Sequence, residues 1–146
     1  MELSKNDRLL LSWRPLVSFG LLKFGSPLTN DHQRYKFKKA EQARQVDGCQ
    51  VFDSDEFDFF VSVEEGVVDS ASCQGKCYFN DRNLIGVEIG EVLSLLGYSP
   101  DREPDDVFDL DWGVQQVWDL DEMGAQVWEL HGRLETITVS RLYSDE

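Results

Sequence analysis

The feature that most constrains this chain is a stretch of 23 residues that occurs twice. Residues 117–139 can be laid without a gap on residues 51–73, at an offset of 66. Each copy reads as strand, acidic turn, strand, tight turn and strand, and a glycine falls where a hairpin turn needs positive φ. The identical pairs are Val51/Val117, Asp53/Asp119, Asp55/Asp121, Glu56/Glu122, Val61/Val127 and Gly66/Gly132. We interpret the match as an internal duplication.

Alternation of apolar and polar residues predicts the strands of both copies. From Phe57 to Val63 the odd positions are apolar, which is typical of a strand with one buried face. In the first copy we expect strands over about 50–52, 57–63 and 67–72. In the second copy the corresponding expectations are 116–118, 125–130 and 134–139.

Two helices are expected, one before each set of strands. The clearer one spans 83–97, because apolar residues recur at spacings of three and four from Ile89 to Leu96. Gly97 suits the left-handed residue that often ends a helix. The other would begin at Asn30 or Asp31 and run to about Arg44, with a mobile loop as the alternative.

Together these elements predict an α+β fold. We expect two pseudo-repeated helix-plus-three-strand units that form a mostly antiparallel sheet with helices on one face. The units would cover about 14–75 and 76–141 within a single domain, 1–146, which suits a chain of 146 residues. Upstream, the pair Phe24–Gly25 echoes the pair Ile85–Gly86 at an offset of 61.

Charge is divided unevenly along the chain. Residues 1–46 carry nine Lys/Arg against four acids, whereas residues 47–146 carry five against 24. A surface this acidic repels nucleic acid and anionic lipid and attracts basic proteins. We therefore expect neither nucleic acid nor a membrane as a partner. The alternative interpretation is that the acidity serves only solubility.

The N-terminal region and the cysteines bear on location. The apolar run at 9–11 is too short for an export signal or a membrane span, so we expect a cytoplasmic protein. Three cysteines, an odd number, argue against a secreted disulfide framework. Cys73 and Cys77 lack the spacing of a redox or zinc motif, so buried, reduced thiols are expected, with a disulfide between them as the alternative.

No catalytic motif is evident in the sequence. Neither His32 nor His131 has a Ser or Cys nucleophile placed with it, and no phosphate-binding glycine loop or H-E-x-x-H is present. The acidic connection at 98–113 fits a calcium loop in no register. We expect a protein without catalytic residues, metal or cofactor.

Acids and one tryptophan are the candidates for partner binding. Trp112 lies beside a glycine among acids, which is typical of a binding hot spot for a basic protein; core packing is the alternative. For the repeated turn acids the alternative is simple turn propensity. The expected partner-binding residues are Asp101, Glu103, Asp105, Asp106, Asp109, Asp111, Trp112, Asp119, Asp121 and Glu122.

The pattern of residues 84–139 resembles a known repeat unit. It is carried by Leu84, Ile85 and Gly86, by Glu91 and Val92, by Leu95, Leu96 and Gly97, and by Gly132. This order is similar to the repeat of β-lactamase inhibitory protein and BamE-like domains, which implies an inhibitory or scaffolding module without catalysis. Small acidic chains of this kind also resemble immunity proteins of contact-dependent or polymorphic toxin systems.

The resemblance to immunity proteins implies a mechanism. In those systems an acidic face occludes a basic toxin domain, often a nuclease. We therefore expect an immunity-type inhibitor that binds a basic toxin domain in the cytoplasm and blocks it. Two other interpretations remain: a non-catalytic scaffold or adaptor module, and a small-molecule-binding domain with its ligand in the cleft between sheet and helix.

Overall fold

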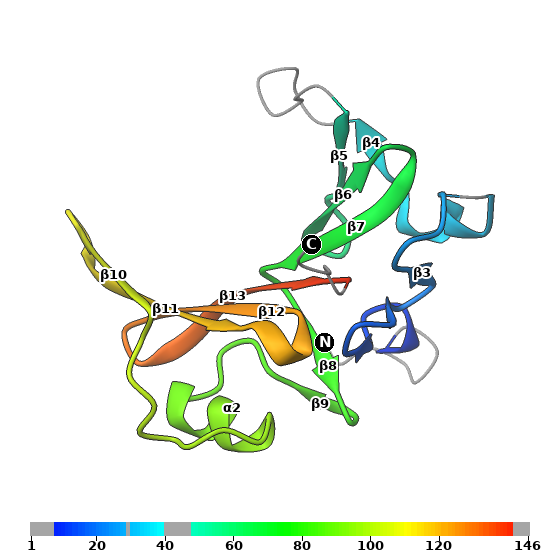
Figure 1. Cartoon of the computed structure of the whole chain (residues 1–146). Helices are drawn as coiled ribbons and strands as arrows, with labels where there is room; N and C mark the ends of the chain where they lie inside the picture. The colour runs from blue at the N-terminus through cyan, green and yellow to red at the C-terminus, as the bar shows by residue number, and fades with distance from the viewer. Residues whose placement is uncertain (1–7, 29, 40–47, 142–146) are drawn as a thin grey trace.

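The computed structural model describes residues 8–28, 30–39 and 48–141, and most of them lie in β-strands (Figure 1). The strands are β1 Trp13–Arg14, β2 Ser18–Phe19, β3 Leu22–Lys23, β4 Lys38–Lys39, β5 Cys49–Ser54, β6 Phe59–Glu64, β7 Val67–Cys73, β8 Tyr78–Phe79, β9 Arg82–Asn83, β10 Asp106–Leu110, β11 Gly113–Leu120, β12 Ala125–Leu130 and β13 Arg133–Ser140. The helices are the 3₁₀ turns η1 Asn30–Tyr35 and η3 Asp121–Met123 and the α-helix α2 Ile89–Leu95.

An antiparallel sheet of eight strands organises the molecule, in the order β10-β11-β12-β13-β7-β6-β5-β4. Short hairpins form two smaller sheets, β1-β2-β3 and β8-β9. The strands of the repeat, expected from alternation, are confirmed, and most extend a residue or two beyond the expected bounds. β6 begins later than expected because Asp58 has a φ of 55° and belongs to the preceding turn.

The expected α+β class is wrong. Strands make up 51 % of the structure and helices 12 %, so there are no two helix-plus-three-strand units with helices on one face. Of the expected helix from residue 30, the described part is η1 followed by β4, and residues 40–44 lie outside the described ranges. Its thin apolar face gave a long helix little to bury.

The expected helix over 83–97 is much shorter than predicted. The apolar stripe is real, but α2 covers only Ile89–Leu95. Before it, the Asn83 side-chain oxygen accepts hydrogen bonds from the N–H groups of Cys77 and Ile85. Gly86 then takes a φ of 86°, and its N–H donates to the carbonyl of Leu134. Pairing with the main sheet therefore displaces the first turns of the expected helix.

The two strand triplets match residue for residue at the offset of 66. β6 and β12 cover equivalent positions, and both ladders are bulged at the same place, after Ser62 and after Trp128. The turns that follow, at 65–66 and 131–132, have φ of 51° and 84° against 55° and 84°. Two positive φ values in a two-residue loop define the hairpin turn that matches the twist of the strands.

The triplets meet edge to edge through β7 and β13. Thr138 pairs with Ser72, which is its own equivalent at the offset of 66, and their hydroxyl oxygens lie 2.8 Å apart. Ile137 pairs with Cys73 and Val139 with Ala71. Thr138 thus faces its own equivalent, and each neighbour of Thr138 faces the equivalent of the other neighbour. This pattern defines a local two-fold axis between the halves.

The equivalence continues upstream of the triplets. The N–H of Gly25 donates to Val68, and that of Gly86 donates to Leu134, at 2.8 Å in both halves. Val68 and Leu134 are equivalent at the offset of 66. Gly25 and Gly86, which match at an offset of 61, therefore make the same contact in the two halves. The hairpin β2-β3 likewise corresponds to β8-β9, at an offset of 60.

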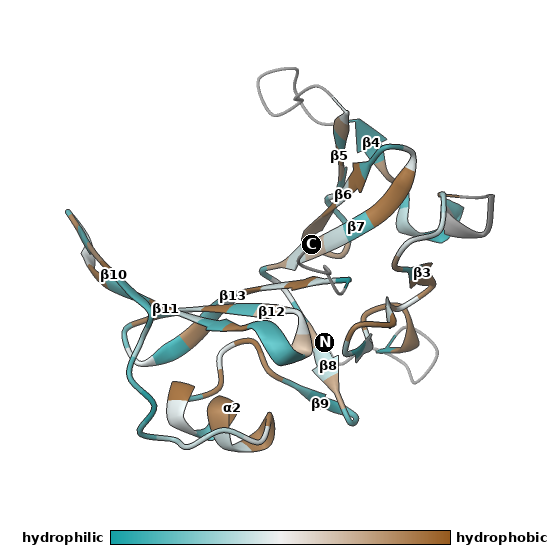
Figure 2. Ribbon diagram, in the orientation of Figure 1, coloured by the Kyte–Doolittle hydropathy of each residue, from teal (hydrophilic) through white to brown (hydrophobic). Residues whose placement is uncertain are grey.

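One face of the large sheet is covered and the other is open. On the covered face Phe19 of β2 packs edge-on against Phe59, with ring centroids 5.2 Å apart. In the second half Val92 and Leu93 of α2 are buried in the same apolar cluster. Figure 2 shows apolar residues along α2 and the central strands. Alternate residues of the strands, many of them Ser and Thr, form what we call the open face.

No helix among the described residues is long and apolar enough to cross a membrane.

Candidate protein-interaction site

A hairpin at the edge of the sheet projects from the body of the molecule. Asp105, strand β10, the turn after it and the first half of β11 (residues 105–116) form this arm, and its tip points away from α2 (Figure 1). Four large apolar side chains are exposed on it: Val107 by 56 %, Phe108 by 43 %, Trp112 by 65 % and Val114 by 47 %. Apolar residues gathered on a projecting element mark an interaction surface more often than isolated ones do.

Both faces of the arm carry apolar groups. Residues Asp109 and Val114 are opposite each other, which places Val107 beside Val114 on one face and Phe108 on the other. Trp112 occupies the two-residue turn between Leu110 and Gly113. An inserted arm can therefore make contact with a partner on both faces and at its tip.

A chain of contacts connects the arm to the open face. The Phe108 ring stacks on Trp128, with centroids 5.9 Å apart and planes at 8°. The Trp128 indole N–H donates to Gln126 at 2.9 Å, and the Gln126 amide donates to the Asp119 carboxylate at 2.8 Å. Sequence reasoning missed Phe108 and Gln126 as site residues. Their signal was the strand alternation of β10 and β12.

The second half of the chain contains a long stretch without cations. Residues 103–132 include no Lys or Arg. The acids in that stretch are Glu103, Asp105, Asp106, Asp109, Asp111, Asp119, Asp121, Glu122 and Glu129. These charges repel one another and are neutralised best by a basic partner.

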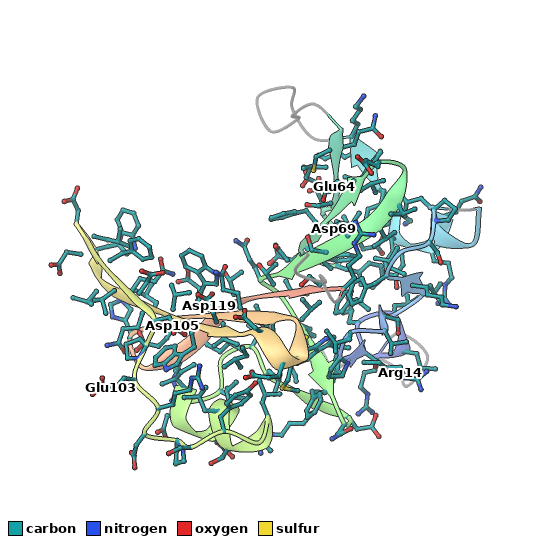
Figure 3. The ribbon with its side chains drawn as sticks, in the orientation of Figure 1. Arg14, Glu64, Asp69, Glu103, Asp105 and Asp119 are labelled. Atoms are coloured by element: carbon teal, nitrogen blue, oxygen red, sulfur yellow. The ribbon has the colours of Figure 1, made fainter. Side chains whose placement is uncertain are left out.

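The predicted acids do not form one continuous face. Asp105 and Asp119 lie together, since the Asp119 backbone N–H donates to the Asp105 carboxylate at 2.7 Å (Figure 3). Asp109 and Asp111 accompany Trp112 toward the end of the arm. Asp101 and Glu103 are exposed in the connection before β10, whereas Asp106 is exposed at the start of that strand.

Glu122 has a structural contact of its own. The Tyr98 hydroxyl donates to its carboxylate at 2.8 Å, and the Arg102 guanidinium lies 5.2 Å from the centre of the Tyr98 ring. Partial burial and the adjacent carboxylate raise the pKa of Tyr98 to about 12. The hydrogen bond from Tyr98 lowers the pKa of Glu122. This cluster fastens the acidic connection to η3.

Two grooves lie on the open face, one in each half. The groove in the first half has a volume of about 470 Å³ and is lined by Asp53, Ser54, Asp55, Asp58, Phe59, Phe60, Ser72 and Gln74. The groove in the second half has about 510 Å³ and is lined by Asp69, Ser70, Asp119, Asp121, Gly124, Ala125, Gln126, Thr138, Ser140 and Arg141. Seven of the eight residues in the first lining have their equivalent, at the offset of 66, in the second.

The residues that line the second groove are more polar than those of a typical small-molecule site. Pockets for such ligands are lined mainly by hydrophobic and aromatic side chains with a few polar groups. Here carboxylates, hydroxyls and amides predominate in the second groove, and Ala125 is its only apolar side chain. A groove of this composition suits polar or cationic groups of a partner.

Neither Cys73 nor Cys77 lines either groove. Cys73 and Cys77 are both free and fully buried. Burial raises the pKa of the Cys73 thiol well above its ordinary value. Within residues 8–28, 30–39 and 48–141, no group of three or more His, Cys, Asp or Glu is arranged to hold a metal ion.

Comparison with known proteins adds no relative: no family model, curated protein or solved structure matches this chain.

Proposed function

We propose that this protein is an immunity-type inhibitor that binds a basic toxin domain in the cytoplasm and blocks it. The observation that supports this most is the arm, where exposed Trp112 and Phe108 lie among acids in a stretch without Lys or Arg. Opposite charge speeds encounter with a basic protein, and aromatic side chains supply most of the affinity at hot spots. Inhibition is steric and electrostatic, without chemistry on the partner.

The arm suits the phosphate-binding surface of a toxin such as a nuclease. There Lys and Arg side chains hold the substrate, and carboxylates compete for them through charge-assisted hydrogen bonds. Asp106, Asp109 and Asp111 are exposed at three points along the arm and turn. Trp112 at the tip removes water from the contact.

The direct test uses the basic domain encoded by the neighbouring reading frame. Co-expression with this protein should restore growth, and the purified pair should bind tightly, with affinity that falls as salt rises. Changing Trp112→Ala should weaken binding at least about 30-fold, the equivalent of a hot-spot loss of about 2 kcal/mol. The matched control is Val17→Ala, which removes an apolar side chain exposed by 48 % outside the arm.

Three outcomes would point elsewhere. Neutralisation that survives charge reversal at Asp105, Asp106, Asp109 and Asp111 would exclude the arm as the contact. Affinity unchanged between about 0.05 and 0.5 M salt would indicate a scaffold or adaptor, because screening weakens exposed charge contacts. Thermal stabilisation by a small molecule without any protein partner would indicate a ligand-binding domain.

A further inference from the structure

In the first half, a lysine already pairs with an acid that lines the first groove. Lys38 of β4 lies opposite Asp53, and its ammonium is 2.5 Å from the Asp55 carboxylate. Next to it, Lys36 pairs with Glu56 at 3.1 Å. Asp55 and Glu56 are the acids of the repeated turn. In the first half, therefore, the chain itself supplies cations to these acids.

The second groove lacks the equivalent lysine. At the offset of 66, Lys38 corresponds to Pro104. The ladder agrees: β10 pairs Asp106 with Val117, so continuing that register by two residues places Pro104 opposite Asp119, the equivalent of Asp53. Proline has no charge to offer. The acid that corresponds to Asp55 is Asp121.

The two cations that are near the second groove have other contacts. Arg102 corresponds to Lys36, but its guanidinium lies against the Tyr98 ring and donates to the backbone carbonyl of Asp119 at 3.4 Å. Arg141 lines the groove and pairs with Asp69 at 3.1 Å. Among the described residues, no ion pair links a Lys or Arg to Asp121.

We propose that the acids lining the second groove bind a Lys or Arg side chain of the basic partner, as Asp55 binds Lys38 in the first half. This inference rests on the proposed function and names a second contact for it beyond the arm. The internal copy shows the occupant: the same acidic turn, on the same sheet register, holding an ammonium group. Asp121 takes the role of Asp55, and Asp119 that of Asp53.

The position of the groove fits a partner already held by the arm. Asp119 in its lining accepts from Gln126, Gln126 accepts from Trp128, and Trp128 stacks on Phe108 of the arm. Between Phe108 and the groove lies only the Trp128 side chain in this series of contacts, so a partner that covers Phe108 is close to the groove. The Asp119 carboxylate is already held by the hydrogen bond from Gln126, which reduces the ordering cost of binding a cation there.

Exchange of residues between the halves tests this directly. Pro104→Lys gives the second half a lysine equivalent to Lys38, which should compete with an external lysine for Asp119 and Asp121. The probe is a fluorescein-labelled decalysine peptide, measured by anisotropy at about 0.15 M salt, where charge effects extend only about 8 Å. We expect Pro104→Lys to weaken binding about two- to five-fold, the range of an exposed ion pair. Lys38→Ala should strengthen it by a similar factor, because it leaves the Asp55 carboxylate available to the peptide.

Matched controls separate the groove from net charge. Ser94→Lys makes the same charge change on α2, away from the open face, and should leave the affinity unchanged. Asp121→Asn should weaken binding about two- to five-fold, whereas Asp81→Asn, in the exposed β8-β9 turn, should not. Far-UV circular dichroism verifies that each variant folds, and Asp121→Asn serves if Pro104→Lys does not.

The proposal would be overturned if Pro104→Lys changed the affinity no more than Ser94→Lys does. It would also be overturned if Asp121→Asn changed it no more than Asp81→Asn does, because the peptide would then respond only to the total charge. The peptide assay requires no toxin. If these differences appear but the protein fails to neutralise its neighbour's toxin, the groove stands and the proposed function falls.

Discussion

Tyr35 joins three parts of the N-terminal half at a single buried hydroxyl. Its side chain is fully buried, donates to the Leu10 carbonyl at 2.7 Å and accepts from the Leu21 N–H at 2.8 Å. Burial raises its pKa to about 12. A Cβ at Gly20 would meet this hydroxyl at 2.1 Å, so the glycine is required by close approach as well as by its φ of 61°.

Removing this hydroxyl should destabilise the fold and change its response to alkali. Tyr35→Phe leaves the Leu10 carbonyl and the Leu21 N–H without this partner, at a cost of about 1–3 kcal/mol in unfolding free energy. In the native protein the folded state holds the phenolic proton more tightly than the unfolded state does. The contribution of Tyr35 to the free energy of unfolding is therefore fully present below pH of about 10, and it declines as pH rises toward about 12.

Urea unfolding at several pH values measures both effects. The wild-type free energy of unfolding should fall between pH of about 9.5 and 11.5, and Tyr35→Phe should reduce that fall. Some of the fall remains in Tyr35→Phe, because the pKa of Tyr98 is also raised in the folded protein. An identical pH slope in the two proteins would show that the Tyr35 phenol does not titrate as described.

At the scale of elements, the junction between β7 and β13 decides how the repeat is used. Two three-stranded meanders each leave an edge strand, and pairing those edges removes both and produces one continuous sheet. The outer edges differ. β4 is two residues long and basic, whereas β10 is longer and acidic and forms part of the arm. The halves are thus equivalent in scaffold and different in surface.

The hydroxyl pair on the local axis should contribute coupling energy across this junction. Ser72→Ala and Thr138→Val each remove one partner of the 2.8 Å contact. In a double-mutant cycle we expect a coupling of about 0.2–1 kcal/mol, the range for cross-strand pairs. The control cycle replaces Ser72→Ala by Ser94→Ala on α2, and its effects should add. Additivity in both cycles would show that the axis pair carries no net energy.

For the whole molecule, the N-terminal segment makes the two halves inseparable. The Tyr78 N–H of the second half donates to the Leu11 carbonyl at 2.8 Å, and the Trp13 ring lies 5.4 Å from Phe79. Leu16 bridges to Arg141 at the far end of β13. Most of the buried apolar residues of both halves belong to one cluster. We therefore expect the two halves to fold together and not as independent units.

Unfolding should accordingly be one cooperative event. Thermal curves followed by far-UV circular dichroism and by tryptophan fluorescence should coincide, because Trp13 and Trp118 report on opposite halves of one core. A fragment of residues 77–141 should lack the dispersed amide spectrum of a folded domain. A folded fragment, or two separate transitions, would show that each half has a sufficient core of its own.

The sequence predicted local features well and their surroundings less well. Glycine turns and alternating strands were readable because hairpin geometry and one-sided burial impose short, local patterns, as from Val61 to Gly66. The length of the helix expected over 83–97 was overestimated, because the hydrogen bond between Gly86 and Leu134 connects residues 48 positions apart. At the site, the acids were readable from composition, but the grouping of Asp119 and Asp121 with Gln126 and Thr138 required the sheet register.

By itself, the sequence determined the duplication, the acidity of residues 103–132 and the positions of the hairpin turns, since each depends on the identity or spacing of nearby residues. Only the tertiary structure decided that the two copies share one sheet about an axis at Ser72 and Thr138. It alone paired Lys38 with Asp55 across the first half. The paired edges are far apart in the sequence, and no local pattern encodes which edges will meet.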